Sequence, residues 1–232
     1  LCSHTAMDGW RGGAWFIPKV LDKTFLVLFF RDSIMAQKPI PMPEKFLRGC
    51  AFWFFVDWEV SSQEMYNDFL AKNCLEDLAF LRQFAGLCDG LRFSYPARIL
   101  FSRNPKNPHK IHINYPGTGV TPDDAKRVCT ELQGRFQAAF VSDDPAWSWD
   151  KIFDKGPYAN GGLRILGACK EGQRSGYQIL DLHSGLYEPL HIQQLLATSI
   201  RTEYGGVILL STETPVPSAQ STIYWSNSTE QS

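Results

Sequence analysis

The sequence has 232 residues, a formal net charge of −1, 44% apolar residues and 13% aromatic residues. This length and apolar content fit one large domain, or two small lobes, with a packed core. A charge this close to zero excludes a global cationic field that would draw the chain to nucleic acid or to an anionic membrane, so a polyanion would have to bind a local patch.

The cysteines and the apolar runs indicate the compartment. Six cysteines are scattered without CxxC spacing or a zinc-like His pair, and four of them lie in apolar or helical segments. We therefore expect buried free thiols and an intracellular, reducing location rather than disulfides and secretion. No apolar run reaches the roughly 18 residues of a membrane span, and no signal peptide is visible. The chain opens at Leu1 without an initiator Met, which is consistent with an excised fragment.

The first part of the chain predicts two buried strands and one long helix. The strands cover Phe25–Phe30 and Cys50–Val60, a proline-containing loop covers Ile34–Lys45, and the helix runs from Ser61 or Ser62 to about Cys88. Both strands are short apolar runs. The helix has a serine N-cap, an acid in its first turn and apolar residues at helical spacing.

The rest of the chain predicts short strands that alternate with helices. Strand candidates are Leu91–Phe93, Arg98–Ser102, His109–Asn114, Leu163–Leu166, Tyr177–Leu182 and Val207–Leu210, and helix candidates are Thr121 to about Phe140 and Ile192–Ile200. Thr121 is a strong helix start, because a proline and two acids follow it. The tail from Thr212 is rich in Ser, Thr and Pro and predicts extended or partly disordered chain. The alternation predicts an α/β or α+β fold.

Two carboxylates, Asp57 and Glu59, end the apolar run AFWFFVDWEV. Residues i and i+2 of a strand point to the same face. Two acids on one face of a buried strand repel each other and are costly to desolvate unless a cation lies between them. They favour a Mg²⁺ or Mn²⁺ site that water and substrate phosphates complete. A solvated strand edge or a turn is the alternative.

Two further clusters follow in the sequence. The segment KIHIN places Lys110, His112 and Asn114 on one strand face, which suits a triphosphate; a structural histidine with satisfied hydrogen bonds is the alternative. The segment IFDKGPYANGGLRILGACK carries a third acid and then two cations, which are Asp154, Arg164 and Lys170. Taken singly, these could be a turn cap and surface charges. Their order along the chain favours a metal-plus-phosphate site.

These segments together resemble the three motifs of the archaeo-eukaryotic primase superfamily. VDWEV resembles the hydrophobic strand that ends in acid–x–acid, and KIHINYPG resembles the Ser–x–His strand. FDKGPYANGGLRILGACK is similar to the third motif of the PrimPol, poxvirus and herpesvirus branches, in which Tyr, Arg and Lys follow the Asp. The later EPLHIQQLLATSIR resembles the short Leu-rich helix that closes this core. The resemblance covers roughly residues 48–205, and it departs from the family at Lys110, where Ser is usual.

The resemblance implies an α+β fold, with an RRM-like mixed sheet and flanking helices that form two α/β lobes around a cleft. Residues 1–48 would be an incomplete lead-in with one strand, residues 49–205 the primase-polymerase catalytic core, and residues 206–232 a C-terminal strand and extended tail.

The resemblance also implies a function and a set of partners. Asp57, Glu59 and Asp154 would hold two Mg²⁺ or Mn²⁺ ions, while four residues would contact nucleotide phosphates: Lys110, His112, Arg164 and Lys170. The chain would then make primers from NTPs or dNTPs on single-stranded DNA during replication. A helicase domain or subunit would assist it, with no membrane involved. The location would be a site of DNA replication, in the nucleus, a mitochondrion or a viral factory.

The template would lie along a basic stretch that includes Arg98, Arg103, Lys106 and Lys110, although a solvated loop explains the first three equally well. The same residues fit other classes of protein less well. A rolling-circle nuclease needs two His ligands on one face, whereas His109 and His112 lie three residues apart on a strand and face opposite sides. An unrelated metal-dependent hydrolase usually needs more clustered His and acid residues. A non-catalytic binding module with a degenerate primase fold stays open.

Overall fold

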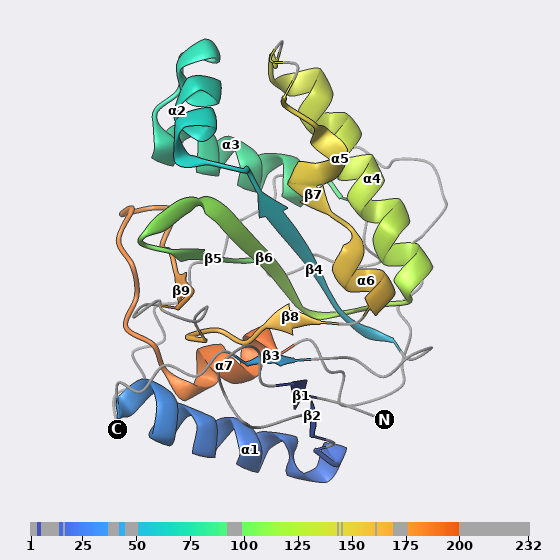
Figure 1. Ribbon diagram of the computed structural model, residues 1–232, viewed down its shortest axis with the longest axis vertical. Coiled ribbons are helices and arrows are strands. Elements are labelled where there is room, and N and C mark those ends of the chain that lie inside the picture. The colour runs from blue at the N-terminus through green and yellow to red at the C-terminus, as the bar shows by residue number, and fades with distance from the viewer. Residues whose placement is uncertain are drawn as a thin grey trace.

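A five-stranded antiparallel sheet forms the centre of the structure, with helices on both of its faces (Figure 1). This computed structural model describes residues 4–5, 14–15, 17–36, 42–44, 51–91, 99–142, 144, 146–160, 162–168 and 176–199. The strands run in the order β7 (Phe153–Asp154), β4 (Phe52–Glu59), β6 (Asn107–Val120), β5 (Leu100–Asn104) and β9 (Gln178–Ile179). The α+β class is confirmed. The expected mixed sheet is wrong, because every pairing among the described strands is antiparallel.

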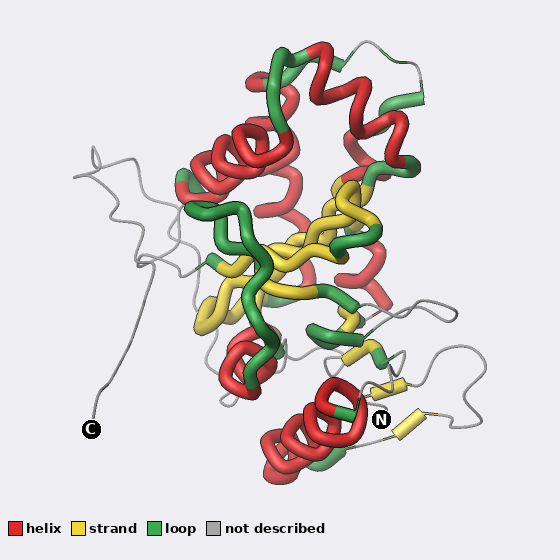
Figure 2. Tube along the Cα trace, turned by 90° about the vertical axis from the view of Figure 1, so that its left-hand side faces the viewer, coloured by secondary structure: helices red, strands yellow, loops and turns green. Residues whose placement is uncertain are grey.

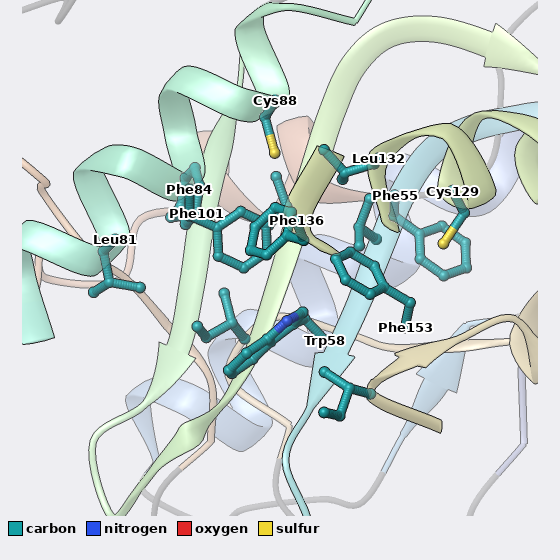
Figure 3. Close-up of a cluster of buried hydrophobic side chains, with 14 of the residues drawn as sticks. Phe55, Trp58, Leu81, Phe84, Cys88, Phe101, Cys129, Leu132, Phe136 and Phe153 are labelled. Atoms are coloured by element: carbon teal, nitrogen blue, oxygen red, sulfur yellow. The ribbon is translucent and has the colours of Figure 1, made fainter. Parts of the chain in front are cut away.

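One face of the sheet carries the larger apolar core. It is covered by α2 (Gln63–Lys72), α3 (Asp77–Asp89), α4 (Pro122–Ala139) and the short α5 (Trp149–Ile152), with α6 (Gly156–Asn160) beside β4 (Figure 1). Aromatic rings fill the space between sheet and helices: Trp58 of β4 packs against Phe84 of α3, which packs edge-on against Phe136 of α4 (Figure 3). Such burial of aromatic side chains dominates the energetics of a core.

The other face carries a second, smaller apolar cluster. The helices α1 (Asp22–Phe29) and α7 (Ile192–Thr198) lie on this face. The 3₁₀ turn η1 (Lys19–Leu21) precedes α1, and the π-helix η2 (Phe30–Met35) follows it. A small four-stranded sheet lies near them, in the order β2 (Ala14–Trp15), β1 (His4–Thr5), β3 (Pro43–Glu44) and β8 (Leu163–Arg164). Figure 2 shows the helices of the two faces, α2 to α5 on one and α1 with α7 on the other, on opposite sides of the central sheet. Leu26, Phe29, Tyr177 and Leu195 are among the buried members of this cluster.

The segment Phe25–Phe30, expected as a strand, belongs to α1 and the start of η2, so that prediction is wrong. Leu26 and Phe29 are buried, whereas Val27 and Leu28 between them are more than 40% exposed. This one-sided burial at a spacing of three residues is helical. A run of six apolar residues contains no polar position to reveal the period, and a short apolar run alone cannot separate a strand from a helix.

The expected long helix after the acid pair is two helices, since α2 ends at Lys72 and α3 begins at Asp77. Cys74 lies in the break with a positive φ of 53°. The predicted start is confirmed, because the Ser62 side chain accepts a hydrogen bond from the backbone N–H of Met65 at 3.2 Å. The start of α4 is confirmed in the same way, with Thr121 Oγ1 accepting from the backbone N–H of Asp124 at 3.2 Å.

Most of the later strands differ from the prediction in length. β6 is longer than the expected His109–Asn114, β8 and β9 have two residues each, and α7 ends at Thr198. Most of the expected strand at Leu91–Phe93, and all of the one at Val207–Leu210, lie outside the described residues. Cys88 and Cys129 are buried free thiols as expected, whereas Cys74 is free but exposed. In the described part of the chain no helix is long and apolar enough to cross a membrane.

Candidate active site

The register of the central sheet gathers residues of all three motifs. Asp57 lies directly opposite His112 of β6 on one side and opposite Asp154 of β7 on the other. Glu59, two residues further along β4, lies opposite Lys110. Residues directly opposite in antiparallel strands share a face and bring their Cβ atoms to within about 5.5 Å. Three acids and two basic side chains therefore lie together on the face of the sheet that carries the smaller apolar cluster.

Asp57 lies at the centre of this group and is the most buried of the three acids. Its side chain is 16% exposed, and among the described residues its Oδ1 is buried and accepts no hydrogen bond. His112 Nε2 lies 3.5 Å from that oxygen. Burial raises the pKa of Asp57 to about 7, as do the charges of Glu59 and Asp154, while Arg164 and Lys110 act in the opposite direction. A bound cation would stabilise the ionised form of a buried acid that has two acidic neighbours.

Asp57, Glu59 and Asp154 are the residues that could hold a divalent cation. Glu59 and Asp154 are engaged elsewhere, however. The Glu59 carboxylate forms an ion pair with the Lys110 ammonium, and Asp154 Oδ1 accepts a hydrogen bond from the backbone N–H of Gly156 at 2.8 Å. Within the described ranges, no three His, Cys, Asp or Glu side chains are arranged as a set of metal ligands. Binding of an ion would therefore require at least Glu59 to change its contact.

Tyr177 completes the group, although no pattern in the sequence indicates a role for it in the site. Its ring stacks on the imidazole of His112, with ring centroids 3.7 Å apart and an angle of 11° between the planes. The guanidinium carbon of Arg164 lies 5.9 Å from the centre of the same ring. The ring of Tyr177 thus stacks on one side chain of the second motif and contacts the guanidinium of the third, which is a favourable arrangement for an aromatic face. Burial raises the pKa of Tyr177, so its hydroxyl stays protonated.

Two glycines position Tyr177. A Cβ atom on Gly176 would lie 2.2 Å from the carbonyl oxygen of Gly167, a distance that no side chain permits. Gly167 itself has a φ of +80°, and its backbone N–H donates to the carbonyl of Tyr177 at 2.9 Å. This close backbone approach needs glycine at both positions. A glycine directly before an aromatic residue was the available sequence signal, but it does not reveal which residue the ring contacts.

Tyr158, which follows Asp154 in the third motif, has a structural position. It is buried against the aromatic rings of β4, and its hydroxyl donates a hydrogen bond to the backbone carbonyl of Phe55. Phe55 lies two residues before Asp57 on the same strand. Tyr158 therefore links α6 to the strand that carries the acid pair.

Some of the residues expected to bind nucleotide or template lie elsewhere. Lys170 and Arg98 lie outside the described residues. Arg103 faces away from the site and forms an ion pair at 2.6 Å with the half-exposed Asp77 of α3; its own side chain is buried, so it is not a solvated loop residue. Asn114 donates a hydrogen bond to the Thr198 carbonyl of α7 at 3.3 Å. His109 contacts Gln63 of α2, on the side of β6 away from His112.

No protein-family model matches the chain, and no curated protein matches it either. The interpretation of this site therefore depends on its own geometry and electrostatics.

Proposed function

We propose that the protein is a metal-dependent nucleotidyltransferase of the primase-polymerase type, which makes primers on a single-stranded DNA template during DNA replication. The observation that carries the proposal is the position of Asp57 between Asp154 and His112, with Glu59 two residues along the same strand. Arg164 and Lys110 act on the same carboxylate. A group of acids beside a group of cations suits a metal-bound triphosphate. An RRM-like core with two lobes is part of this proposal.

The acids fit a pair of Mg²⁺ or Mn²⁺ ions. Asp57 would be a shared ligand, because its buried Oδ1 accepts no hydrogen bond in the described part of the chain. Glu59 and Asp154 would complete the protein ligands from either side. Carboxylate oxygens are the ligands that these hard cations prefer. When bound, the ions would lower the pKa of an attacking 3′-hydroxyl and stabilise a pyrophosphate leaving group.

The other side chains would bind and orient the incoming NTP or dNTP. Arg164 presents a planar guanidinium, which binds phosphate oxygens in pairs. His112 would donate a hydrogen bond to a phosphate oxygen, with its ring held in place by Tyr177. Lys110 would contribute a further charge to the triphosphate, and Lys170 is proposed for the same role from the sequence alone.

The partners follow from the same proposal. A chain with a net charge of −1 would bind single-stranded DNA weakly by itself, so a helicase domain or subunit would help to hold the template. Action at a site of DNA replication inside the cell is proposed with it. Nanomolar, steeply salt-dependent binding of single-stranded DNA by the chain alone would contradict this part of the proposal.

The proposal is tested by primer synthesis on a single-stranded DNA template with labelled nucleotides and Mg²⁺ or Mn²⁺. We expect short products from the natural chain and none from Asp57→Asn, which keeps the shape of the side chain and removes its charge. Asp123→Asn is the matched control, since Asp123 is an exposed acid of α4 with a 97% exposed side chain. Its products should equal those of the natural chain.

Mn²⁺ binding, measured by electron paramagnetic resonance of the free ion, separates the remaining outcomes. A chain that binds Mn²⁺ through Asp57 but makes no primers would retain the metal site and require a further domain for synthesis. A folded chain that neither binds Mn²⁺ nor makes primers would overturn the proposal and favour a non-catalytic binding module.

A further inference from the structure

The contact between Lys110 and Glu59 links a proposed phosphate ligand to a proposed metal ligand. The two residues lie opposite each other on β6 and β4, and the ammonium of Lys110 forms an ion pair with Glu59 Oε1. The side chain of Lys110 is only 17% exposed and that of Glu59 is 38% exposed. The pair is therefore shielded from water more than a surface ion pair, and it occupies the carboxylate that a metal ion would need.

The charges around the site explain this contact. Three acids lie together on β4 and β7, and the cations that act on Asp57 are Arg164 and Lys110. Arg164 stands over the ring of Tyr177, whereas Lys110 reaches Glu59 directly. Of the two, lysine is the more mobile cation, because its ammonium is a point charge on a flexible four-carbon stem. It can stabilise a carboxylate in one state and leave it in another.

We propose that Lys110 is a built-in competitor of the divalent metal: its ammonium neutralises Glu59 in the metal-free protein, and metal binding displaces it toward the nucleotide triphosphate. This inference rests on the proposed function, since it concerns the same metal and the same nucleotide. One side chain thereby serves two anions in turn. Metal entry creates a cationic group for the triphosphate at the moment when the triphosphate can bind.

This exchange has a consequence that an ordinary structural ion pair lacks. Removing the charge of Lys110 leaves Glu59 free and removes a positive charge close to the incoming ion, so metal affinity rises. The same substitution removes a phosphate ligand, so nucleotide affinity falls. Substitution of a lysine that only stabilises the fold would not raise the affinity for metal while lowering the affinity for nucleotide.

The experiment measures Mn²⁺ binding by electron paramagnetic resonance on the whole chain without nucleotide. We expect Lys110→Met to lower the dissociation constant for Mn²⁺ about tenfold, which corresponds to removing one moderately shielded like charge. Lys110→Gln is the second variant, because it keeps polar atoms at the end of the side chain if methionine disturbs the strand. Both variants are first compared with the natural chain by circular dichroism.

Lys155→Met is the matched control. Lys155 follows Asp154 directly, but its ammonium contacts Gln133 and Asp150 instead of the site acids. This variant changes the net charge by the same amount and leaves Glu59 in its ion pair. We expect its Mn²⁺ affinity to stay within about twofold of the natural value, because the Lys155 charge is paired with Asp150 and salt screens what remains.

Calorimetric titration of a nucleoside triphosphate at saturating Mn²⁺ tests the second half of the exchange. We expect affinity to fall about tenfold in Lys110→Met and Lys110→Gln, which is the loss of one charge-assisted contact. Mn²⁺ binding that is unchanged or weaker in both variants would overturn this inference. The proposed function would still stand in that case, provided that the natural chain binds Mn²⁺. Unchanged triphosphate affinity would overturn the release of Lys110 to the nucleotide. Absence of Mn²⁺ binding from all the proteins would overturn both proposals together.

Discussion

Asp57 is the residue whose ionisation governs the electrostatics of the site. Burial and its acidic neighbours raise its pKa from 3.8 to about 7. Below about pH 3 the carboxyl is mostly protonated in both the folded and the unfolded chain and contributes almost nothing to the pH dependence. As the pH rises toward 7, the unfolded chain ionises freely, whereas ionisation of the folded chain is opposed. The free energy of unfolding therefore decreases over this window and stays reduced above it.

We predict that Asp57→Asn removes this pH dependence in the metal-free protein. At pH 8 the variant should be more stable than the natural chain by about 2 kcal/mol, roughly half of what three pKa units are worth, because the partly exposed carboxylate is screened by solvent. At about pH 3, where the carboxyl is mostly protonated in both states, the two should unfold at the same denaturant concentration. Urea unfolding at both pH values, with a chelator present, measures the difference. Parallel pH profiles for the two proteins would show that Asp57 titrates normally.

Tyr177 tests whether the stack on His112 orients the imidazole. We predict that Tyr177→Leu lowers kcat/KM for nucleotide about tenfold or more, because the ring of His112 loses its packing partner. Tyr177→Phe keeps the ring and should stay within about threefold of the natural value. Mn²⁺ affinity should be unchanged in both variants, since Tyr177 is not among the acids. Equal losses in the two variants would assign the effect to the hydroxyl and its contact with Arg164 instead.

At the scale of elements, the sequence predicted those features that depend on local rules. The N-caps at Ser62 and Thr121 and the shared face of Asp57 and Glu59 follow from short-range geometry. The helix at Phe25–Phe30 was missed because its period is decided by which residues it buries against α7, a distant part of the chain. The contact of Tyr177 with His112 was missed for the same reason, since strand register sets it and no local pattern encodes it.

Arg103 lies in the basic stretch that predicts a template contact or a solvated loop, but in the folded chain it packs against a helix instead. Its guanidinium forms two hydrogen bonds with Asp77, at 2.6 and 2.7 Å, and so joins β5 to the start of α3. Burial opposes ionisation of Asp77, but the hydrogen bonds and charge of Arg103 outweigh it and hold the pKa of that carboxyl below its usual range. The Asp77 side chain is 47% exposed, which screens the pair on one side.

We predict that Arg103→Met destabilises the protein by about 2 kcal/mol, which is less than the loss for a fully buried pair because Asp77 stays partly solvated. Binding of single-stranded DNA should be unchanged, since Arg103 faces the helices. Urea unfolding and fluorescence anisotropy with a labelled oligonucleotide measure the two effects. Weaker DNA binding at unchanged stability would restore Arg103 as a template contact.

At the scale of the whole molecule, the site lies between two apolar clusters. Tyr158 of the larger cluster holds β4 by its hydrogen bond to Phe55, and Tyr177 of the smaller cluster covers His112. The three acids repel each other where these two cores meet at the central sheet. A cation bound there would relieve this repulsion in the folded chain, whereas the unfolded chain disperses the same charges. Binding of a metal ion at the proposed site would therefore be coupled to folding.

We predict that Mn²⁺ at about one hundred times its dissociation constant stabilises the natural chain by about 2.7 kcal/mol, as the binding linkage requires. For a chain of this length that corresponds to a rise of roughly 5–10 °C in the unfolding temperature at pH 8. Asp57→Asn should lose most of the rise, and the exposed-acid control Asp123→Asn should keep it. Differential scanning calorimetry with and without Mn²⁺ measures all three proteins. An equal rise in the natural chain and in Asp57→Asn would place the bound ion away from the acids of β4 and β7, because a site that does not use Asp57 is indifferent to its charge.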